Sequence, residues 1–313
     1  MIVIDAEEVR RRLDHRTCIG LMREAMIALS TGRSKQLLRG IIDLERGNAF
    51  GVMPGALEGS GFGAKLISVF PRAERSHQGV IVTFDEQTGA PRAVIDAGEV
   101  TAIRTACASA AASDALARPD AHTLAILGTG EQAWQHALAV PLVRRVDTIR
   151  IWGRSTDKAE ALAHRIEAEL GIATHAFATV PEAAAGADII CTTTAAADPI
   201  LHSRDVADGT HINLVGSSRA GPVEIDTPLV ARARFIPDHR EGVLAQGAEF
   251  LRAKAAGAVT DAHVLPEIGA VFAGQAPGRL APADVTIYKS LGSIVQDLAV
   301  AGHLVATRAS RAG

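Results

Sequence analysis

The sequence predicts an α/β protein with a doubly wound parallel sheet and a second α+β domain built on an open antiparallel sheet. Between about residues 123 and 237, short apolar runs alternate with Ala-rich helical segments, a pattern typical of parallel strands covered by helices. A Gly-Thr-Gly turn at 128–130 joins the first apolar run to a helical segment. The earlier part of the chain instead holds Gly-rich extended pieces, which favour an antiparallel sheet of hairpins.

Length and composition bound the class of protein. The chain has 313 residues, which suggests two domains at roughly 150 residues each. Aromatic residues make up 4% and the formal net charge is -3, so neither stacking platforms nor a basic field for nucleic acid or an anionic membrane is expected. The three cysteines are far apart and odd in number, which gives no disulfide framework and no metal motif. We therefore expect a cytoplasmic protein without a metal.

The first domain is expected over residues 1–118. Its predicted elements are a helix over 5–31, extended pieces at 39–45, 48–55, 63–70, 79–89 and 91–98, turn clusters at 85–89 and 96–98, and a helix over about 101–117. The last helix should end at Arg118-Pro119, because proline disfavours a helical residue before it.

The second domain is expected over residues 119–290. Its predicted strands cover 123–128, 148–153, 188–194 and 211–216, and its predicted helices cover 131–140, 157–170 and 181–187. Near-continuous apolar strands are typical of a parallel sheet buried on both faces. The tail over 285–308 should form a strand, a turn and a closing helix. We expect that helix, about 291–313, to pack back on the first domain.

The turn Gly128-Thr129-Gly130-Glu131-Gln132-Ala133 follows an apolar strand and precedes a helix. This is the setting of the Rossmann dinucleotide fingerprint. Gly128 allows the tight turn, Gly130 lets the backbone approach a pyrophosphate, and Ala133 allows close helix packing. The helix start at Glu131 and Gln132 offers N–H groups and a positive dipole end to the phosphates. The alternative is a tight turn selected for packing alone.

The second strand of this domain ends in Gly153-Arg154-Ser155-Thr156. NAD-binding sites usually place an acid here, whereas Arg154 can bind a 2′-phosphate. We therefore expect NADP(H), with NAD(H) as the alternative because Asp157 lies slightly later. A solvated turn with an ordinary surface arginine would look the same.

Two cations of the first domain stand out. Lys65 shares a strand face with Ile67 and Val69, and an isolated buried charge is costly. It therefore has either a partner or a catalytic role, unless it is an edge-strand lysine that reaches water. Arg104 falls in the first turn of the predicted helix, where a cation opposes the helix dipole. A bound anion such as a cofactor phosphate would explain Arg104, and so would a salt bridge to a nearby acid.

Taken together, these residues resemble the ornithine cyclodeaminase/mu-crystallin family. The resemblance runs from about residue 39 to 300 and rests on ordered matches at Met53-Pro54-Gly55, Lys65, Thr88-Gly89, Arg104-Thr105-Ala106, the turn at 128–133, Asn213-Leu214-Val215-Gly216, Glu224 with Asp226, Lys289-Ser290-Leu291-Gly292 and Gln296-Asp297. It implies a Rossmann domain joined to an open antiparallel sheet that pairs in a homodimer, with a nicotinamide cofactor in the cleft between domains.

The resemblance also implies roles for individual residues. Arg39 and Lys65 would hold the substrate carboxylate, with Lys65 near the reacting carbon. The implied cofactor contacts are Ser76, His77, Arg104, Gly128, Gly130, Glu131, Gln132, Gly153, Arg154, Ser155, Thr192, Thr193, Val215 and Gly216, and the remaining implied substrate contacts are Ser218, Ser290 and Leu291.

The family holds two chemistries. Reductases and dehydrogenases move a hydride between the nicotinamide and the α-carbon of an amino acid or its imine, whereas ornithine cyclodeaminases also expel ammonia and return the hydride. The cyclodeaminases carry an aspartate where this chain has Ser218. A hydroxyl neither pairs with a substrate ammonium as a carboxylate does nor acts as a base near neutral pH, so the site resembles the mu-crystallin reductase branch.

The leading hypothesis is therefore an NADP(H)-linked reductase or dehydrogenase of amino acid metabolism that acts on a small amino or imino carboxylate. One alternative is ornithine cyclodeaminase, with Glu224 or Asp226 replacing the missing acid, although both are expected to cap the following helix. The other is a non-catalytic NADP-binding protein, against which the retention of Arg39 and Lys65 argues.

Overall fold

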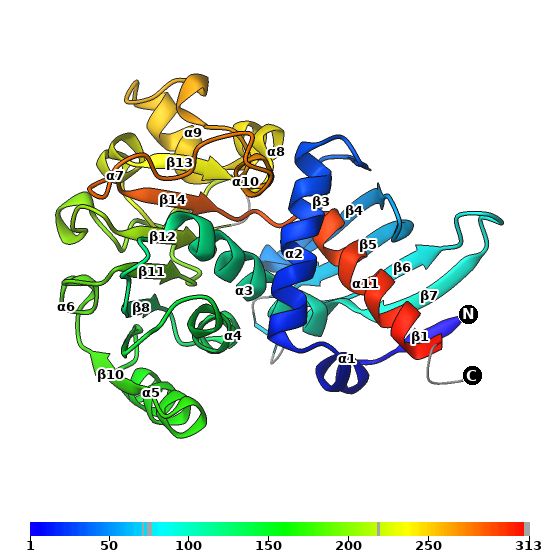
Figure 1. Cartoon of the computed structure of the whole chain (residues 1–313), viewed down its shortest axis with the longest axis horizontal. Coiled ribbons are helices and arrows are strands. Elements are labelled where there is room, and N and C mark those ends of the chain that lie inside the picture. The colour runs from blue at the N-terminus through cyan, green and yellow to red at the C-terminus, as the bar shows by residue number, and fades with distance from the viewer. Residues whose placement is uncertain (71, 74–76, 218–219, 310–313) are drawn as a thin grey trace. The chain divides into compact units, whose positions relative to one another are not determined.

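The computed structural model describes residues 1–70, 72–73, 77–217 and 220–309 (Figure 1). Internal contacts divide the chain into two units, Met1–Arg104 with Ser293–Gly313, and Thr105–Gly292. The border falls inside helix α3 (Ala97–Leu116). One unit is built on a mixed sheet and the other on a parallel sheet, which confirms the predicted fold class apart from the mixed character of the first sheet.

The sheet of the first unit is an antiparallel meander with one added parallel strand. Its strands run in the order β1-β7-β6-β5-β4-β2, with β3 also paired to β4. They cover β1 Ile2–Ile4, β2 Ser34–Gln36, β3 Gly40–Asp43, β4 Ala49–Leu57, β5 Gly61–Val69, β6 His77–Phe84 and β7 Pro91–Asp96. The strands at the predicted extended pieces pair antiparallel, as expected. The N-terminal strand β1, which was not predicted, adds one parallel pair with β7.

Two helices, rather than the predicted single one, precede this sheet. They are α1 (Ala6–Arg12) and α2 (His15–Ser30). The break occurs at Asp14, which has extended backbone and accepts a hydrogen bond from the Thr17 N–H at 2.9 Å. A side-chain acceptor at this place satisfies a free N–H of a new helix, so Asp14 starts α2 instead of continuing α1.

The closing helix α11 (Ile294–Ala309) belongs to the first unit. It packs on β4, β5 and β6 and lies beside α2 (Figure 1). Val295 and Leu298 are fully buried in it, and so is the charged Asp297. The position of α11 thus brings a buried acid to the face of the strand that carries Lys65.

Helix α3 starts earlier than predicted. Asp96, the last residue of β7, accepts a hydrogen bond from the Glu99 N–H at 2.7 Å, so the expected turn at 96–98 is a strand-to-helix junction. Arg104 consequently lies two turns into the helix rather than in its first turn. The helix dipole acts mainly within the terminal turn, so the dipole argument for an anion beside Arg104 does not apply.

The second unit contains a parallel sheet in the order β10-β9-β8-β11-β12-β14-β13. The strands are β8 Thr123–Leu127, β9 Thr148–Trp152, β10 Ala173–Phe177, β11 Ile189–Thr192, β12 His211–Leu214, β13 Arg234–Pro237 and β14 Thr286–Lys289. Strands β10 and β13 were not among the predicted ones. Chain order reverses between β8 and β11, and ligands of such sheets bind at the carboxyl ends of the strands beside this reversal.

Helices cover both faces of the parallel sheet. One apolar cluster joins Leu124 and Ile126 to α4 (Glu131–Ala139) and α5 (Thr156–Leu170), and the other joins Ala125 and Leu127 to the opposite layer. The remaining helices are α6 Val180–Ala184, α7 Thr227–Arg232, α8 Arg240–Gln246, α9 Ala248–Ala255 and α10 Ile268–Phe272, with 3-10 turns at Glu45–Gly47, Val140–Leu142, Ser203–Asp205 and Asp261–His263. Alternate strand residues therefore face opposite layers, as the sequence predicts.

Two features bear on cross-linking and on membrane insertion, namely the cysteines and the longer helices of the described residues. Cys18, Cys107 and Cys191 are buried free thiols. Within the residues that the structure describes, none of the helices combines the length and the apolar character needed to cross a bilayer.

Candidate functional site

The glycine turn of the second unit lies where β8 ends and α4 begins. Gly128 has φ +136°, and its N–H donates to the Trp152 carbonyl at 2.7 Å. A Cβ on Gly128 would lie 2.5 Å from Thr193 Oγ1 and 2.8 Å from the Thr193 carbonyl oxygen. Only glycine therefore fits, because the backbone conformation and the close approach of the loop after β11 both exclude a side chain.

Gly130, unlike Gly128, has open space around its Cα. It is the N-cap of α4 with extended backbone, and a Cβ built on it would find nothing within 4 Å. There is therefore open space over the helix start, beside the N-terminal N–H groups and the positive end of the dipole. Ala133 is fully buried in the core below. This cradle fits the diphosphate of a dinucleotide.

The loop after β11 buttresses the turn. Thr193 donates to the Leu127 carbonyl through its N–H at 2.8 Å and its hydroxyl at 3.1 Å. Thr192 points elsewhere, since its hydroxyl donates to Glu224 Oε2 at 2.7 Å. The N–H groups of Val215 and Gly216, after β12, donate to the Thr192 carbonyl at 3.1 and 3.2 Å. The structure thus brings these sequence-predicted residues together beside the chain reversal.

Glu224 organises this edge of the sheet. Its fully buried carboxylate accepts hydrogen bonds at 2.7 Å from the Thr194 N–H, the Thr194 hydroxyl and the Gly216 N–H as well as from Thr192. Burial raises the pKa of Glu224, and the hydrogen bonds to Thr194 and Thr192 oppose that shift. The expectation that Glu224 caps the next helix was wrong, whereas Asp226 does cap α7 by accepting from the Leu229 N–H at 3.0 Å.

A second buried acid shapes the loop after β14. Asp238 accepts hydrogen bonds from the N–H groups of Leu291 and Gly292 at 2.7 and 2.6 Å. Burial raises its pKa, and these hydrogen bonds act in the opposite direction. Ser290 is buried, and within the described residues its hydroxyl has no hydrogen-bond partner. Sequence reasoning missed Asp238, although an acid directly after the apolar strand at 234–237 was a usable signal.

The loop after β9 contains Gly153, Arg154 and Ser155, the residues predicted to bind the 2′-phosphate end of the cofactor. Gly153 lies against the Thr129 side chain, where a Cβ would collide with it. Arg154 is exposed. Ser155 is the N-cap of α5 and accepts a hydrogen bond from the Lys158 N–H at 3.4 Å.

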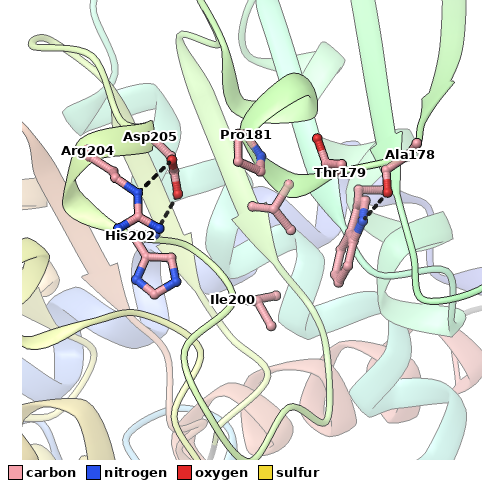
Figure 2. A pocket seen from close by; sticks show the side chains of 9 residues that line it. Ala178, Thr179, Pro181, Ile200, His202, Arg204 and Asp205 are labelled. Carbon is pink, nitrogen blue, oxygen red and sulfur yellow. Dashed lines mark hydrogen bonds and ion pairs between the residues drawn. The ribbon is translucent and has the colours of Figure 1, made fainter.

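A pocket of about 410 Å³ opens beside this loop (Figure 2). Its lining comes from the end of β9, the start of α6 and the segment after β11, namely Trp152, Ala178, Thr179, Val180, Pro181, Ile200, His202, Arg204 and Asp205. The indole of Trp152 donates to the Ala178 carbonyl at 3.3 Å. Sequence reasoning missed this pocket because its walls come from segments that only the fold assembles.

The first unit buries Lys65 in the middle of its sheet. Lys65 is 1% exposed on β5, which lies between β4 and β6, so the edge-strand interpretation was wrong. Its ammonium donates to Thr101 Oγ1 at 2.5 Å and to Asp297 Oδ1 at 3.2 Å. The lysine therefore has the partner that its apolar surroundings demand.

Arg104 shares the same acid. Its Nε lies 3.1 Å from Asp297 Oδ1, and its Nη1 donates to Gln296 Oε1 at 3.0 Å. The salt bridge considered from the sequence is therefore present. Asp297 is fully buried, and its Oδ2 has no hydrogen-bond partner within the described residues. One carboxylate thus serves two buried cations, and the cluster of Lys65, Arg104 and Asp297 has a net positive charge.

Burial lowers the pKa of Lys65 from 10.5 to about 8. The negative charge of Asp297 opposes this shift, whereas Arg104 and Arg39 act in the same direction as burial. Arg39 is half-buried between β2 and β3. With a pKa of about 8, the Lys65 ammonium is mostly protonated at pH 7 and can release its proton slightly above that pH.

The structure describes only part of the remaining predicted site residues, His77, Ser76 and Ser218. His77 is the first residue of β6 and pairs with Val69. Ser76 and Ser218 lie outside the described residues. Asp297 was noted in the sequence only as part of a matching motif, although an acid within an apolar helix was the same signal that singled out Lys65.

The doubly wound sheet and its glycine turn define a Rossmann-class protein, joined here to a mixed-sheet unit with a buried cationic cluster. The chain belongs to the ornithine cyclodeaminase/mu-crystallin family, whose model matches residues 1–312. This confirms the resemblance found in the sequence.

Curated and solved relatives agree with this membership. The chain is 32% identical to Delta(1)-pyrroline-2-carboxylate reductase of Bacillus cereus over 97% of its own length and 95% of that protein. It is also 32% identical to the ketimine reductase mu-crystallin of Mus musculus, over 96% and 95%. The structure of the Thermococcus litoralis Delta(1)-pyrroline-2-carboxylate reductase in complex with NADH and L-proline matches with TM-score 0.96 and 27% identity, over 100% of this chain and 98% of that one.

The two glycines of the turn allow a matched test. Gly130→Ala should leave the thermal stability of the free protein nearly unchanged, because the new Cβ meets no protein atom. It should weaken dinucleotide binding by about tenfold or more if the diphosphate occupies that space. Gly128→Ala should instead destabilise the free protein, by about 1–3 kcal/mol. Thermal unfolding and titration of NADPH fluorescence measure both effects, and unchanged affinity in Gly130→Ala would place the diphosphate elsewhere.

Proposed function

We propose that this chain is an NAD(P)-dependent reductase or dehydrogenase that transfers a hydride at the α-carbon of a small amino or imino carboxylate, cyclic imines included. The buried cationic cluster of Lys65, Arg104 and Asp297 carries the proposal. Binding of a dinucleotide alone does not require the buried Lys65, whereas an anionic substrate can use its charge. The reductase names of its curated relatives support the same chemistry.

Recognition of the substrate is assigned to the first unit. We assign the carboxylate to Arg39 and Lys65, since a planar guanidinium binds a carboxylate through two parallel hydrogen bonds and an ammonium adds a point charge. Asp297 keeps Lys65 and Arg104 in place and neutralises only one of them. The excess positive charge remains for the anion.

Lys65 also has the properties of a proton donor. Reduction of an imine adds a hydride to carbon and a proton to nitrogen, and a bound nicotinamide supplies the hydride. A lysine with a pKa of about 8 can polarise the imine and give up a proton near neutral pH. Thr101 and Asp297 orient its ammonium through hydrogen bonds. In the oxidative direction the same amine accepts the proton.

Two observations favour a reductase over a cyclodeaminase. Ser218 stands where cyclodeaminases carry an aspartate. Glu224, the candidate replacement, already accepts hydrogen bonds from Thr192, Thr194 and Gly216. Because both oxygens of the Glu224 carboxylate already accept hydrogen bonds from the protein, this group is poorly suited to binding the side-chain amine of a substrate such as ornithine.

The cofactor is assigned to the second unit. Gly130, Glu131 and Gln132 would hold the diphosphate, and the pocket beside Trp152 would take the adenine. Exposed Arg154 favours NADP(H) over NAD(H) because it can bind a 2′-phosphate. The remaining contacts proposed are Ser76, His77, Arg104, Gly128, Gly153, Ser155, Thr192, Thr193, Val215 and Gly216 for the cofactor, and Ser218, Ser290 and Leu291 for the substrate.

We also propose that the protein is a homodimer paired through the first unit. The segment around β3 exposes Leu37, Leu38, Ile41, Ile42 and Leu44, which are 71%, 37%, 38%, 58% and 41% accessible. Contiguous apolar residues at a sheet edge are typical of an interface between chains. A second copy would cover this edge.

The proposed activity predicts stoichiometric oxidation of NADPH by a cyclic imino carboxylate. A panel of cyclic imines, 2-oxo acids with ammonia or amines, and ornithine should be run with each cofactor while absorbance and ammonia are followed. Ammonia release from ornithine without a net change in cofactor absorbance would identify a cyclodeaminase instead. Cofactor binding without any turnover would leave a binding protein.

Replacement of Lys65 should separate catalysis from folding. Lys65→Met should lower kcat/KM for imine reduction by about a hundredfold or more. Because the protonated ammonium is the active form, wild-type kcat/KM should fall as pH rises through about 8, and this decline should be absent in the variant. Lys35→Met, at an exposed lysine on β2, is the control. A wild-type rate that stays constant well above pH 8 would argue against Lys65 as the acid.

Arg154→Ala tests the choice of cofactor. It should raise KM for NADPH by about ten- to a hundredfold, since a charge-assisted bidentate contact is lost, and leave KM for NADH within about twofold. Arg145→Ala, at a side chain that is 90% exposed, should change neither constant. Equal effects on both cofactors would remove the argument for NADP(H).

A charge on β3 tests the dimer. Ile42→Lys should shift the protein from twice the chain mass toward the chain mass of 32.7 kDa in light-scattering chromatography. Val3→Lys carries the same change on β1, where Val3 is 61% exposed, and should leave the mass unchanged. A wild-type monomer, or a dimer insensitive to Ile42→Lys, would rule out this surface.

A further inference from the structure

The second unit contains a buried ion pair that none of the proposed contacts includes. Lys289 is the last residue of β14, and Glu249 lies in the first turn of α9. Their side chains are 0% exposed, and Lys289 Nζ lies 2.8 Å from Glu249 Oε2.

Both partners also bind backbone at the carboxyl edge of the sheet. Lys289 Nζ donates to the Ser217 carbonyl at 2.5 Å and lies 3.4 Å from the Ser217 hydroxyl. Glu249 Oε1 accepts a hydrogen bond from the Glu224 N–H at 3.2 Å. The ion pair thus connects the end of β14 and the first turn of α9 to the segment after β12, at Ser217, and to the segment before α7, at Glu224.

The dipeptide Gly216–Ser217 is consequently held from both ends. The Glu224 carboxylate accepts from the Gly216 N–H at 2.7 Å, and Lys289 donates to the carbonyl of Ser217. This dipeptide directly precedes Ser218, the proposed substrate contact, and contains Gly216, a proposed cofactor contact.

Stability alone is a poor reason for this arrangement. Removing two charges from water costs several kcal/mol per ion, and well-packed apolar residues often serve a fold as well as a buried ion pair does. Fixing a loop backbone, in contrast, needs a donor and an acceptor at defined places.

We propose that Lys289 and Glu249 are positioning residues that clamp Gly216–Ser217, so that this loop is in place for hydride transfer without either side chain touching substrate or cofactor. The inference rests on the proposed function for its kinetic consequence. The clamp itself has a consequence that needs no activity, namely slow backbone exchange at Gly216 and Ser217.

The decisive variant is Lys289→Met/Glu249→Gln. It removes both charges of the pair together. The amide introduced by Glu249→Gln keeps an oxygen for the Glu224 N–H, whereas the Ser217 carbonyl loses its donor and the buried Glu224 carboxylate, whose pKa Lys289 lowers, keeps its hydrogen bonds from Thr192, Thr194 and Gly216. We expect thermal stability close to wild type, hydrogen–deuterium exchange over residues 213–217 increased about tenfold in the free protein, and kcat lowered about tenfold. Affinity for NADPH should change less than threefold, since the diphosphate turn is untouched.

The control is Lys254→Met/Asp261→Asn. This pair removes the same kinds of charge at 2.6 Å separation on and after the same helix, but its side chains are 46% and 55% exposed. It should alter neither exchange over 213–217 nor kcat.

If Lys289→Met/Glu249→Gln folds and its hydrogen–deuterium exchange over residues 213–217 equals that of the wild type, the ion pair does not hold this loop and the inference is wrong. Increased exchange with a kcat within twofold of wild type overturns the positioning role. If that variant does not fold, Glu249→Gln alone decides, because it removes the charge that holds Lys289, and wild-type exchange with wild-type kcat then overturns the inference. A wild-type protein that neither binds NADPH or NADH nor turns over would instead refute the proposed function, while the exchange result would still decide the clamp.

Discussion

One buried carboxylate makes the cationic cluster of the first unit possible. Lys65 and Arg104 lie among apolar strands and helices, where an uncompensated charge would disfavour folding. Asp297 contacts both through a single oxygen, so the unit can fold with an excess of positive charge in its interior. The same arrangement lowers the pKa of Lys65, because burial outweighs the attraction of one shared acid. The proposed carboxylate binding and proton donation both follow from this shortage of negative charge.

The second unit uses buried acids for a different purpose. Parallel strands end at one edge, and the loops that follow have no sheet partners for their N–H groups. Glu224 accepts from the loops after β11 and β12, and Asp238 accepts from the loop after β14. The ion pair of Lys289 and Glu249 holds the loop after β12 at the Ser217 carbonyl and the segment before α7 at the Glu224 N–H. Burial makes each hydrogen bond stronger than it would be in water, so these buried acids fix the irregular backbone at this edge.

Local pattern predicted the elements far better than it predicted their ends and partners. The glycine turn was recognisable because Gly128 and Gly130 have physical roles that depend only on adjacent residues. The start of α3 was misplaced because Asp96 was assigned to a turn when its side chain caps a helix. The parallel pairing of β1 with β7 could not be foreseen, since a short strand carries no record of its distant neighbour. The pocket beside Trp152 was missed for the same reason.

The sequence by itself determined that the chain alternates strand and helix, that a dinucleotide turn follows residue 127, and that Lys65 is a cation in an apolar strand. The sequence also identified the family, because the motifs that define it occur in a fixed order along the chain and can be recognised without the fold. Only the tertiary structure decided which acid accompanies Lys65, what Glu224 and Asp238 hold, and that Lys289 pairs with Glu249. Lys65 and Asp297 are 232 residues apart, Asp238 and Leu291 are 53 apart, and Lys289 and Glu249 are 40 apart. Contacts between segments so far apart depend on how strands and helices pack, which spacing along the chain does not encode.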